Sequence, residues 1–222
     1  MLIAGIDEAG RGCIIGPLVV AGILMKEKAL PTLRQMGVVD SKLLSPKKRE
    51  KLFNEIILLA ENHHIIKVMP SQIDRAVECK IKLHKLNRLE AKTMTEIINV
   101  LKPSEAYVDA ADVLEKRFKH HIQEGLTVRT RITARHKADR IYPVVSAASI
   151  IAKVERDREI EMLRKVYGDF GSGYLTDKKT IEFLKNWLKT DSDYPSCVRK
   201  SWKTAKRLKN EKGTVQKTLF RL

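Results

Sequence analysis

The chain has 222 residues, of which 43% are hydrophobic and 32% charged, a composition typical of a globular protein of one large or two small domains. Lysine and arginine number 43 against 27 acids, so the net charge is +16, which favours a polyanionic partner such as nucleic acid over a small neutral substrate. The same charge also suits a surface that serves solubility or thermal stability. No apolar run approaches the roughly 20 residues of a membrane span. Cys13, Cys79 and Cys197 show neither a disulfide framework nor a zinc spacing, so we expect a reducing, cytoplasmic location.

The first predicted strand ends on two adjacent acids. An apolar run at the start of the chain predicts a buried strand, and Asp7 and Glu8 follow it where a carboxylate is costly unless it meets a cation or a metal. Gly10 and Gly12 then let the backbone approach a ligand closely, and Arg11 between them is suited to bind a phosphate. Because successive strand side chains point to opposite faces, the two acids can share one site only where the strand ends or bulges. The alternative is an ordinary turn.

The sequence then predicts an apolar strand, a helix, a short strand and a long helix. They cover residues 17–25, a stretch from Pro46, residues 65–69 and residues 80–101. The loop after the first strand is too short for a crossover helix, so the first two strands should pair antiparallel. Ser45 is the N-cap of the first helix. Before it, Lys42 either reaches a phosphate or is simply solvated.

Two further acids follow in the middle of the chain. Asp109 ends a strand-like stretch, and the alanines after it leave space around the carboxylate. Asp112 is better explained by a structural role, either as a helix N-cap or as an acid beside the helix dipole. Residues 127–134 alternate apolar and polar or basic side chains and lead to Asp139, which stands among four basic groups and is either a site acid or their ion-pair partner. His136 lacks a second metal-type ligand at suitable spacing, so we interpret it as a phosphate contact.

The second half of the chain is expected to be mainly helical. Residues 143–167 form the longest helix, apolar nearly all round at first and amphipathic later, so it begins inside the protein and emerges. The glycine-rich loop 168–173 leads to Tyr174, which either stacks on a sugar or base or covers the edge of the core. Thr176 caps another helix. Residues 199–222 hold nine lysines and arginines against one glutamate, and form either a nucleic-acid grip or a solvated end.

The acids come together once the strands form one sheet. With no internal repeat and no long linker, the simplest architecture is one mixed α/β domain. A site formed by several carboxylates, with no cluster of histidines or cysteines, favours binding of the hard cations Mg²⁺ or Mn²⁺ over zinc. In a protein of net charge +16, this combination indicates phosphodiester chemistry by two metal ions. The acids concerned are Asp7, Glu8, Asp109 and Asp139.

Six motifs occur in a fixed order along the chain. They are Gly5-Ile6-Asp7-Glu8-Ala9-Gly10-Arg11-Gly12, Asp40-Ser41-Lys42, Tyr107-Val108-Asp109-Ala110-Ala111-Asp112, His136-Lys137-Ala138-Asp139, Tyr142-Pro143-Val144-Val145-Ser146-Ala147-Ala148-Ser149-Ile150-Ile151-Ala152-Lys153-Val154-Glu155-Arg156-Asp157 and Gly171-Ser172-Gly173-Tyr174. Together they resemble ribonuclease HII, the type 2 ribonuclease H, and its archaeal form most, from Leu2 to about Lys206. The resemblance implies the ribonuclease H-like α/β fold, a mixed five-stranded sheet flanked by helices, with a helical C-terminal extension.

The resemblance also assigns roles to residues. The family's catalytic and metal-binding acids fall on Asp7, Glu8, Asp109 and Asp139, and we expect Asp7 to bridge the metals, Mg²⁺ or Mn²⁺. The loop of Gly10, Arg11 and Gly12, together with Tyr174, is implied to recognise the 2′-hydroxyl of a ribonucleotide at an RNA–DNA junction. We assign phosphate contacts to Lys42, His136 and Lys153. Cys13 and Leu175 depart from the prolines that are usual in the family, and both flank the recognition elements.

We therefore expect an endoribonuclease that hydrolyses the RNA strand of RNA–DNA hybrids and nicks duplex DNA at embedded ribonucleotides. Cleavage would leave 5′-phosphate and 3′-hydroxyl ends, with one metal activating water and the other stabilising the leaving 3′-oxygen. Two alternatives stay open: a ribonuclease HIII-like hybrid nuclease without junction specificity, and a non-catalytic nucleic-acid-binding protein.

The end of the chain carries a separate prediction. We expect residues 1–210 to form the catalytic domain, with the helices from about residue 176 as its extension, and residues 211–222 to form a flexible tail. Gln216, Leu219 and Leu222 resemble the glutamine and apolar anchors by which replication proteins dock on the sliding clamp, although the final aromatic pair is missing. The alternative is a last turn folded onto the body of the protein. The family suggests a monomer.

Overall fold

The computed structural model describes residues 1–222 except 39–40, 42–43, 81–84 and 220–222, with side chains only as far as residue 211. Five strands form one sheet in the order β3-β2-β1-β4-β5. They are β1 (Leu2–Ala9), β2 (Leu18–Lys26), β3 (Asn62–Val68), β4 (Glu105–Asp109) and β5 (Arg131–Arg135). The pairs β1–β2 and β2–β3 are antiparallel, whereas β1–β4 and β4–β5 are parallel, so the expected mixed sheet is confirmed.

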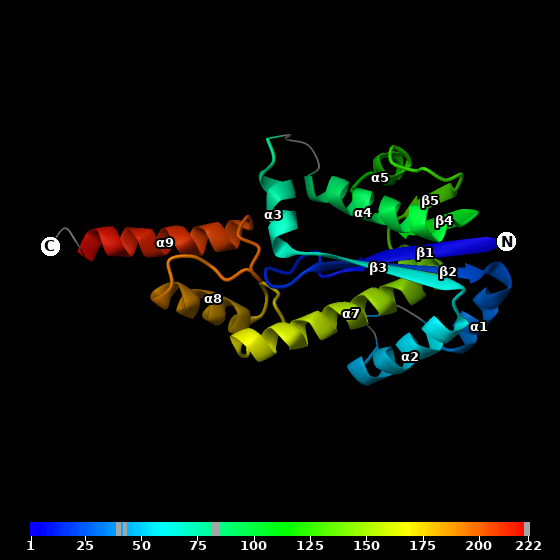
Figure 1. The fold of residues 1–222 in the computed structure, drawn as a ribbon. Coiled ribbons are helices and arrows are strands. Elements are labelled where there is room, and N and C mark those ends of the chain that lie inside the picture. Colours follow the sequence, from blue (N-terminus) through cyan, green and yellow to red (C-terminus); the bar gives the residue numbers. More distant parts are fainter. Residues whose placement is uncertain (39–40, 42–43, 81–84, 220–222) are drawn as a thin grey trace.

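Helices cover both faces of the sheet (Figure 1). One face carries α4 (Lys85–Leu101) and α5 (Glu115–Gln123), and the other carries α7 (Pro143–Tyr167) with α1 (Leu30–Gln35) and α2 (Pro46–Leu59) packed beside it. The shorter elements are η1 (Glu27–Ala29), α3 (Pro70–Glu78) and α6 (Ala138–Ile141). The last helices, α8 (Lys178–Thr190) and α9 (Lys203–Leu219), lie beyond the end of the sheet opposite the N-terminus (Figure 1).

The side chains of β1 alternate between two buried cores. Ile3 packs in the core under α7, whereas Ala4 and Ile6 pack in the core under α4. This alternation follows from the period of two of a strand that is covered on both faces. Continued to the end of β1, it directs Asp7 towards α7 and Glu8 towards α4.

Several predicted elements have other boundaries in the structure. Helix α4 is described from Lys85 to Leu101, residue 80 is not helical, and residues 81–84 of the predicted helix lie outside the described part of the chain. Strand β5 begins only at Arg131. Before it, Thr127 N donates to Asn99 Oδ1 and the Thr130 hydroxyl donates to the Pro103 carbonyl, so these residues bond to the end of α4 and the turn after it instead of to a strand.

The caps were predicted with mixed success. Ser45 caps α2 as expected, because its hydroxyl accepts from Lys48 N. Asp177, and not Thr176, is the N-cap of α8, since its carboxylate accepts from Lys179 N. Asp112 is not the N-cap of α5, because that position is Leu114. It still has a structural role, since its carboxylate accepts from Leu114 N. Its hydrogen bond with Arg117 holds the pKa of Asp112 well below the usual range.

Helix α9 continues through residue 210 as far as Leu219. The division there into a catalytic domain and a flexible tail stays a prediction, and Leu222 and the side chains of Gln216 and Leu219 lie outside what the structure describes. No helix among the described residues is both long enough and apolar enough to cross a membrane.

Gly5 is where α7 crosses β1, and it provides a test of this packing. A Cβ on Gly5 would lie 2.1 Å from the Val144 carbonyl oxygen, whereas a Cβ on Gly12 would meet nothing within 4 Å. Gly5→Ala must therefore push α7 away from the sheet, and we expect it to lower the free energy of unfolding by roughly 1–3 kcal/mol or more. Gly12→Ala is the matched control and should unfold at the wild-type temperature. Equal thermal midpoints for the two variants would contradict this packing.

Candidate active site

The predicted acids gather at the end of the sheet where β1 and β4 finish. Ile6 pairs with Val108 in the parallel ladder, so Asp7 and Asp109 follow on neighbouring strands at the same level. By the alternation of strand side chains both point towards the α7 face. The parallel register thus brings together two carboxylates that are 102 positions apart in the sequence (109 − 7).

Asp7 is a buried carboxylate with only 4% of its surface exposed. Its Oδ1 accepts from Glu8 N at 2.7 Å, and it also hydrogen-bonds to Ser149 of α7. Burial raises the pKa of Asp7 well above its usual value, and the neighbouring charges of Glu8 and Asp109 raise it further. Ser149 Oγ in turn lies 3.0 Å from Ser41 Oγ, so Ser41 of the Asp40-Ser41-Lys42 motif is tied to the site through α7.

Glu8 points to the other face of β1 but belongs to the same electrostatic cluster. Burial raises its pKa to about 8, with further contributions from the charges of Glu90 and Asp109. Its Oε2 is buried and has no hydrogen-bond partner in the described part of the chain. A buried acceptor left in this state is costly, and a cation would relieve the cost.

The other two acids, Asp109 and Asp139, are brought close together by one hydrogen bond to the backbone. Asp109 Oδ1 accepts from Ala138 N at 2.9 Å, and Asp139 follows directly after Ala138 in α6. Asp139 is 6% exposed, and its backbone carbonyl accepts from the hydroxyl of Ser146 on α7. Lys137 adopts a left-handed conformation at φ 55° to start α6, which turns the chain back to Asp109.

This donor set fits a hard divalent cation in chemistry and charge. It offers carboxylate oxygens, and the mutual repulsion of Asp7, Glu8 and Asp109 would be neutralised by a bound cation. Among the described residues, no group of three or more His, Cys, Asp and Glu side chains is already arranged to hold a metal ion. Coordination by all the predicted acids therefore stays a prediction.

The glycine loop after β1 lies beside these acids. Gly10 has φ +84°, and a Cβ there would lie 2.8 Å from the Pro17 carbonyl oxygen, so this position requires glycine. Gly12 is exposed, with open space where a side chain would be. Arg11 Nε donates to Glu90 of α4 at 2.8 Å and its Nη2 to Asn87 at 2.8 Å, so in this structure its guanidinium is held by α4.

Tyr174 is fixed beside the same loop. Its backbone forms an isolated antiparallel β-bridge with that of Cys13, and the guanidinium carbon of Arg156 lies 4.8 Å from the centre of its ring. Arg156 also donates to Cys13 Sγ at 2.8 Å and to the Ser172 carbonyl at 2.6 Å. Burial, with a smaller contribution from Cys13, raises the pKa of Tyr174 to about 12. The predicted recognition elements are therefore adjacent, and Cys13 lies between them.

Cys13 and Leu175, the departures from the family pattern, both fit their surroundings. Cys13 N donates to the Gly10 carbonyl at 3.3 Å, a bond that proline could not make. Leu175 packs against the apolar cluster that joins Ile14 and Ile15 to Leu184 of α8.

The predicted phosphate contacts are engaged within the protein. The ring nitrogens of His136 each lie 3.2 Å from a carbonyl oxygen, those of Ala110 and Val113, so the ring braces the loop after β4. Lys153 Nζ donates to Asp157 Oδ1 at 2.6 Å. Lys42 lies outside the described residues. Their roles towards a substrate stay predictions.

Sequence reasoning missed the residues that support the site. Ser149, Arg156 and Glu90 sit within helical patterns, where their burial is invisible to a linear reading, and Arg199 was counted only as part of a basic tail. The spacing of Ser149, Lys153, Arg156 and Asp157 on one side of α7 was the available signal, because positions i, i+4, i+7 and i+8 share a face.

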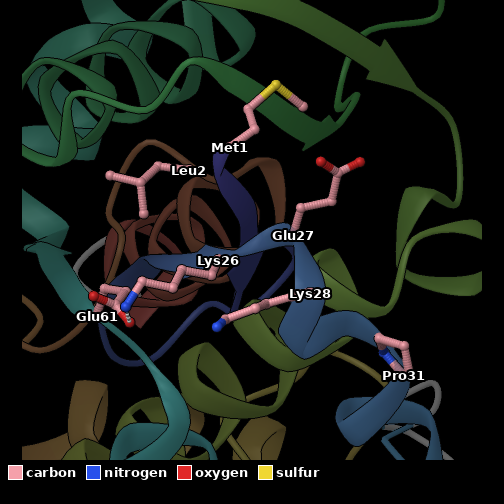
Figure 2. Close-up of a pocket in the computed structure, with 7 residues that line it drawn as sticks. All are labelled: Met1, Leu2, Lys26, Glu27, Lys28, Pro31 and Glu61. Carbon is pink, nitrogen blue, oxygen red and sulfur yellow. Dashed lines mark ion pairs between the residues drawn. The ribbon is translucent and has the colours of Figure 1, made fainter.

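A pocket elsewhere does not contain these groups. It has a volume of about 720 Å³ and is lined by residues where β1 begins and β2 ends, with Lys26 and Glu61 paired at 3.0 Å on one side of it (Figure 2). The candidate acids lie at the opposite end of β1 and β4, so this pocket is separate from the site.

Comparison with known proteins identifies the family. The family model described as Ribonuclease HII matches residues 4–205. Ribonuclease HII of Pyrococcus horikoshii is 46% identical over 221 residues, which cover 99% of this chain and 98% of the relative. Ribonuclease HII of Archaeoglobus fulgidus is 47% identical over 210 residues, which cover 94% and 97%. The chain belongs to the ribonuclease HII family.

Solved structures agree with this assignment. The crystal structure of ribonuclease H2 from P. horikoshii matches with a TM-score of 0.87 at 46% identity, covering 95% of this chain and 98% of that one. The ribonuclease HII in a PCNA complex from A. fulgidus matches with a TM-score of 0.82 at 46% identity, covering 91% and 96%. A ribonuclease HIII structure, with 18% identity and a TM-score of 0.74, shares the fold.

The expected fold and activity are thereby confirmed. Ribonucleases HII are metal-dependent endoribonucleases, and this protein cleaves the RNA of RNA–DNA hybrids. The HIII-like alternative is set aside because the sequence identity over nearly the whole chain is to ribonuclease HII. The non-catalytic alternative is set aside because the matching family is a family of enzymes.

The raised pKa of Glu8 makes a prediction for the metal-free protein. The folded state keeps the Glu8 proton up to about pH 8, whereas the unfolded chain releases it near 4.5, so stability falls as the pH rises between these values. Glu8→Gln removes the charge and should raise the thermal midpoint in chelator at pH 8 by several degrees, with the gain shrinking towards pH 4.5. Glu61→Gln, at a surface ion pair, is the control and should show no such pH-dependent gain. A Glu8→Gln gain that is the same at both pH values would contradict the assignment.

Proposed function

We propose that this ribonuclease HII cuts the phosphodiester next to a ribonucleotide, both in hybrids and at single ribonucleotides within duplex DNA, leaving 5′-phosphate and 3′-hydroxyl ends. The observation that carries the proposal is the cluster of buried, mutually repelling carboxylates at the ends of β1 and β4, beside a glycine loop and a tyrosine. Charge of this kind, placed beside a loop open to a sugar, suits metal-assisted phosphodiester cleavage.

Asp7, Glu8, Asp109 and Asp139 would hold two Mg²⁺ or Mn²⁺ ions. Bound there, the ions would supply an activated water and neutralise charge on the leaving 3′-oxygen. The protein's own contribution is orientation. Ser149 and Glu8 N fix the Asp7 carboxylate, and Ala138 N fixes Asp109, so the oxygens are set before substrate arrives.

Recognition of the ribonucleotide would fall to the loop of Gly10, Arg11 and Gly12 with Tyr174. The open space at Gly12 permits close approach of a sugar, and a 2′-hydroxyl can both donate and accept hydrogen bonds. Tyr174 is held in place by the Arg156 guanidinium over its ring and by the β-bridge of its backbone to Cys13, so its ring would be available beside the loop for contact with a sugar.

The central test replaces one acid. Asp7→Asn keeps the shape of the side chain and removes a buried charge, so the variant should fold at least as stably as the wild type. Because it removes the central ligand, we expect hybrid cleavage in Mg²⁺ or Mn²⁺ to fall about 10³-fold or more, which corresponds to roughly 4 kcal/mol of transition-state stabilisation. Single-turnover rates and thermal midpoints would be measured together.

The same assay includes its own controls. Asp169→Asn, at a surface acid paired with Lys179, should cleave at the wild-type rate. The wild type should also nick a DNA duplex that contains one ribonucleotide. Full activity of Asp7→Asn would refute the site, and cleavage restricted to hybrids would refute the single-ribonucleotide activity.

A second proposal concerns the partner of the C-terminus. The A. fulgidus relative was solved in a complex with PCNA, and Gln216, Leu219 and Leu222 here resemble a clamp-docking box. Helix α9 carries the chain away from the sheet (Figure 1), which would leave its end accessible to a partner. We infer that the last residues bind a sliding clamp.

Truncation tests clamp binding. A chain ending at Gly213 should cleave hybrids at the wild-type rate and lose retention on beads coated with PCNA. The double substitution Gln216→Ala with Leu219→Ala should reproduce the loss, whereas Lys217→Ala should not. Retention of the truncated chain equal to that of the full chain would refute the proposal.

A further inference from the structure

Arg199 lies in the segment between α8 and α9, and its side chain is completely buried. Burial lowers its pKa to about 10, so it is still charged at neutral pH. A buried guanidinium must direct its donors at acceptors, because an unmatched buried charge is strongly unfavourable. The contacts of Arg199 therefore indicate what it was placed to hold.

The acceptors of Arg199 are backbone carbonyls around the glycine loop. Nη2 donates to Gly10 O at 2.7 Å, Nη1 to Arg11 O at 2.8 Å and Nε to Gly16 O at 3.1 Å. Its guanidinium carbon also lies 5.1 Å from the ring centre of Trp202. The planar fork thus grips both ends of the turn that follows β1.

Backbone pairing delivers Arg199 to this place. Arg199 N donates to Ile14 O at 2.8 Å, and Gly16 N donates to Cys197 O at 2.9 Å. On the other side, Asp74 of α3 accepts from Lys200 N and Ser201 N, both at 2.9 Å. The segment is therefore held by hydrogen bonds on two sides, which fix the position of the Arg199 side chain relative to the loop.

Gripping these carbonyls also fixes the amide groups next to them. A peptide unit is planar and trans, so its N–H points opposite to its C=O. With the Gly10 and Arg11 carbonyls directed at the buried Arg199, the N–H groups of Arg11 and Gly12 are directed the other way. Gly12 is exposed, so that direction leads towards the surface where a sugar would lie.

We propose that Arg199 is a positioning residue for ribonucleotide specificity, because it fixes the peptide planes that present the Arg11 and Gly12 N–H groups to the 2′-hydroxyl. This inference rests on the proposed recognition of a ribonucleotide by the glycine loop. It assigns part of that recognition to a residue about 190 positions away in the sequence (199 − 10 = 189) that touches no substrate itself.

The test compares substrates that differ in how much they depend on the loop. An RNA–DNA hybrid presents a 2′-hydroxyl to the loop wherever the enzyme binds along it, whereas a DNA duplex with one ribonucleotide presents a 2′-hydroxyl at a single position. Arg199→Lys keeps the charge but replaces the planar fork by a compact ammonium that cannot reach all of these carbonyls. We expect the single-turnover rate of Arg199→Lys to fall on both substrates, and the loss on the single-ribonucleotide duplex to be at least about ten times the loss on the hybrid. A factor of this size corresponds to the loss of one charged hydrogen bond.

A second readout reports on the loop directly. Amide hydrogen exchange of a peptide spanning residues 9–13 should become faster in Arg199→Lys. Asp74→Asn, which loosens the segment without touching the guanidinium, should shift both readouts in the same direction but less, and it serves if Arg199→Lys does not fold. Arg131→Lys, at a surface pair with Glu105 at the start of β4, is the control and should change neither.

The outcomes separate the two claims. If the wild type cuts a single ribonucleotide and Arg199→Lys keeps the wild-type ratio of the two rates, the inference about Arg199 is refuted, whether or not exchange becomes faster. If the wild type itself does not cut at a single ribonucleotide, the proposed function fails, and the specificity role of Arg199 fails with it. A changed ratio with faster exchange and an unchanged control supports the inference.

Discussion

The parallel pairing of β1 with β4 is the constraint on which the site depends. It sets Asp7 next to Asp109 at the end of the sheet, with Glu8 adjacent on the opposite face. Burial and like charge make this arrangement unfavourable for the protein alone, as the raised pKa values of Asp7 and Glu8 indicate. The fold tolerates the cost because the packed layers on both faces over-determine the strand, and the strain is concentrated where function needs charge.

The glycine loop presents the opposite problem. Gly10 and Gly12 leave room for a ligand, but a loop with so few side chains cannot hold its own shape. Buried arginines supply the missing contacts from outside. Arg199 binds carbonyls of the loop, and Arg156 joins Cys13 to Tyr174. Arginine suits this task since its planar donors can satisfy several fixed acceptors at once.

The C-terminal part of the chain packs directly against the residues that follow β1. Ile14 and Ile15 share an apolar cluster with Phe170 and Leu184, and Ile15 bridges to Val198. The residues that follow the catalytic strand are thus packed by the last quarter of the chain. The segment that joins α8 and α9 supports the glycine loop, because Arg199 donates to the carbonyls of Gly10 and Arg11.

The sequence by itself determined the strands that carry Asp7, Glu8 and Asp109, the antiparallel first hairpin, the long helix over residues 143–167 and the family, because these follow from hydrophobic period and motif order. The predicted end of the first strand before Asp7 was wrong, since β1 stays paired with β2 as far as Ala9. It left open whether Asp7 and Glu8 meet and did not reveal Glu90, Arg156 or Arg199. Those depend on strand register and on contacts across long separations, which no linear pattern records. The tertiary structure decided them, since a buried charge has a meaning only once its acceptors are in place.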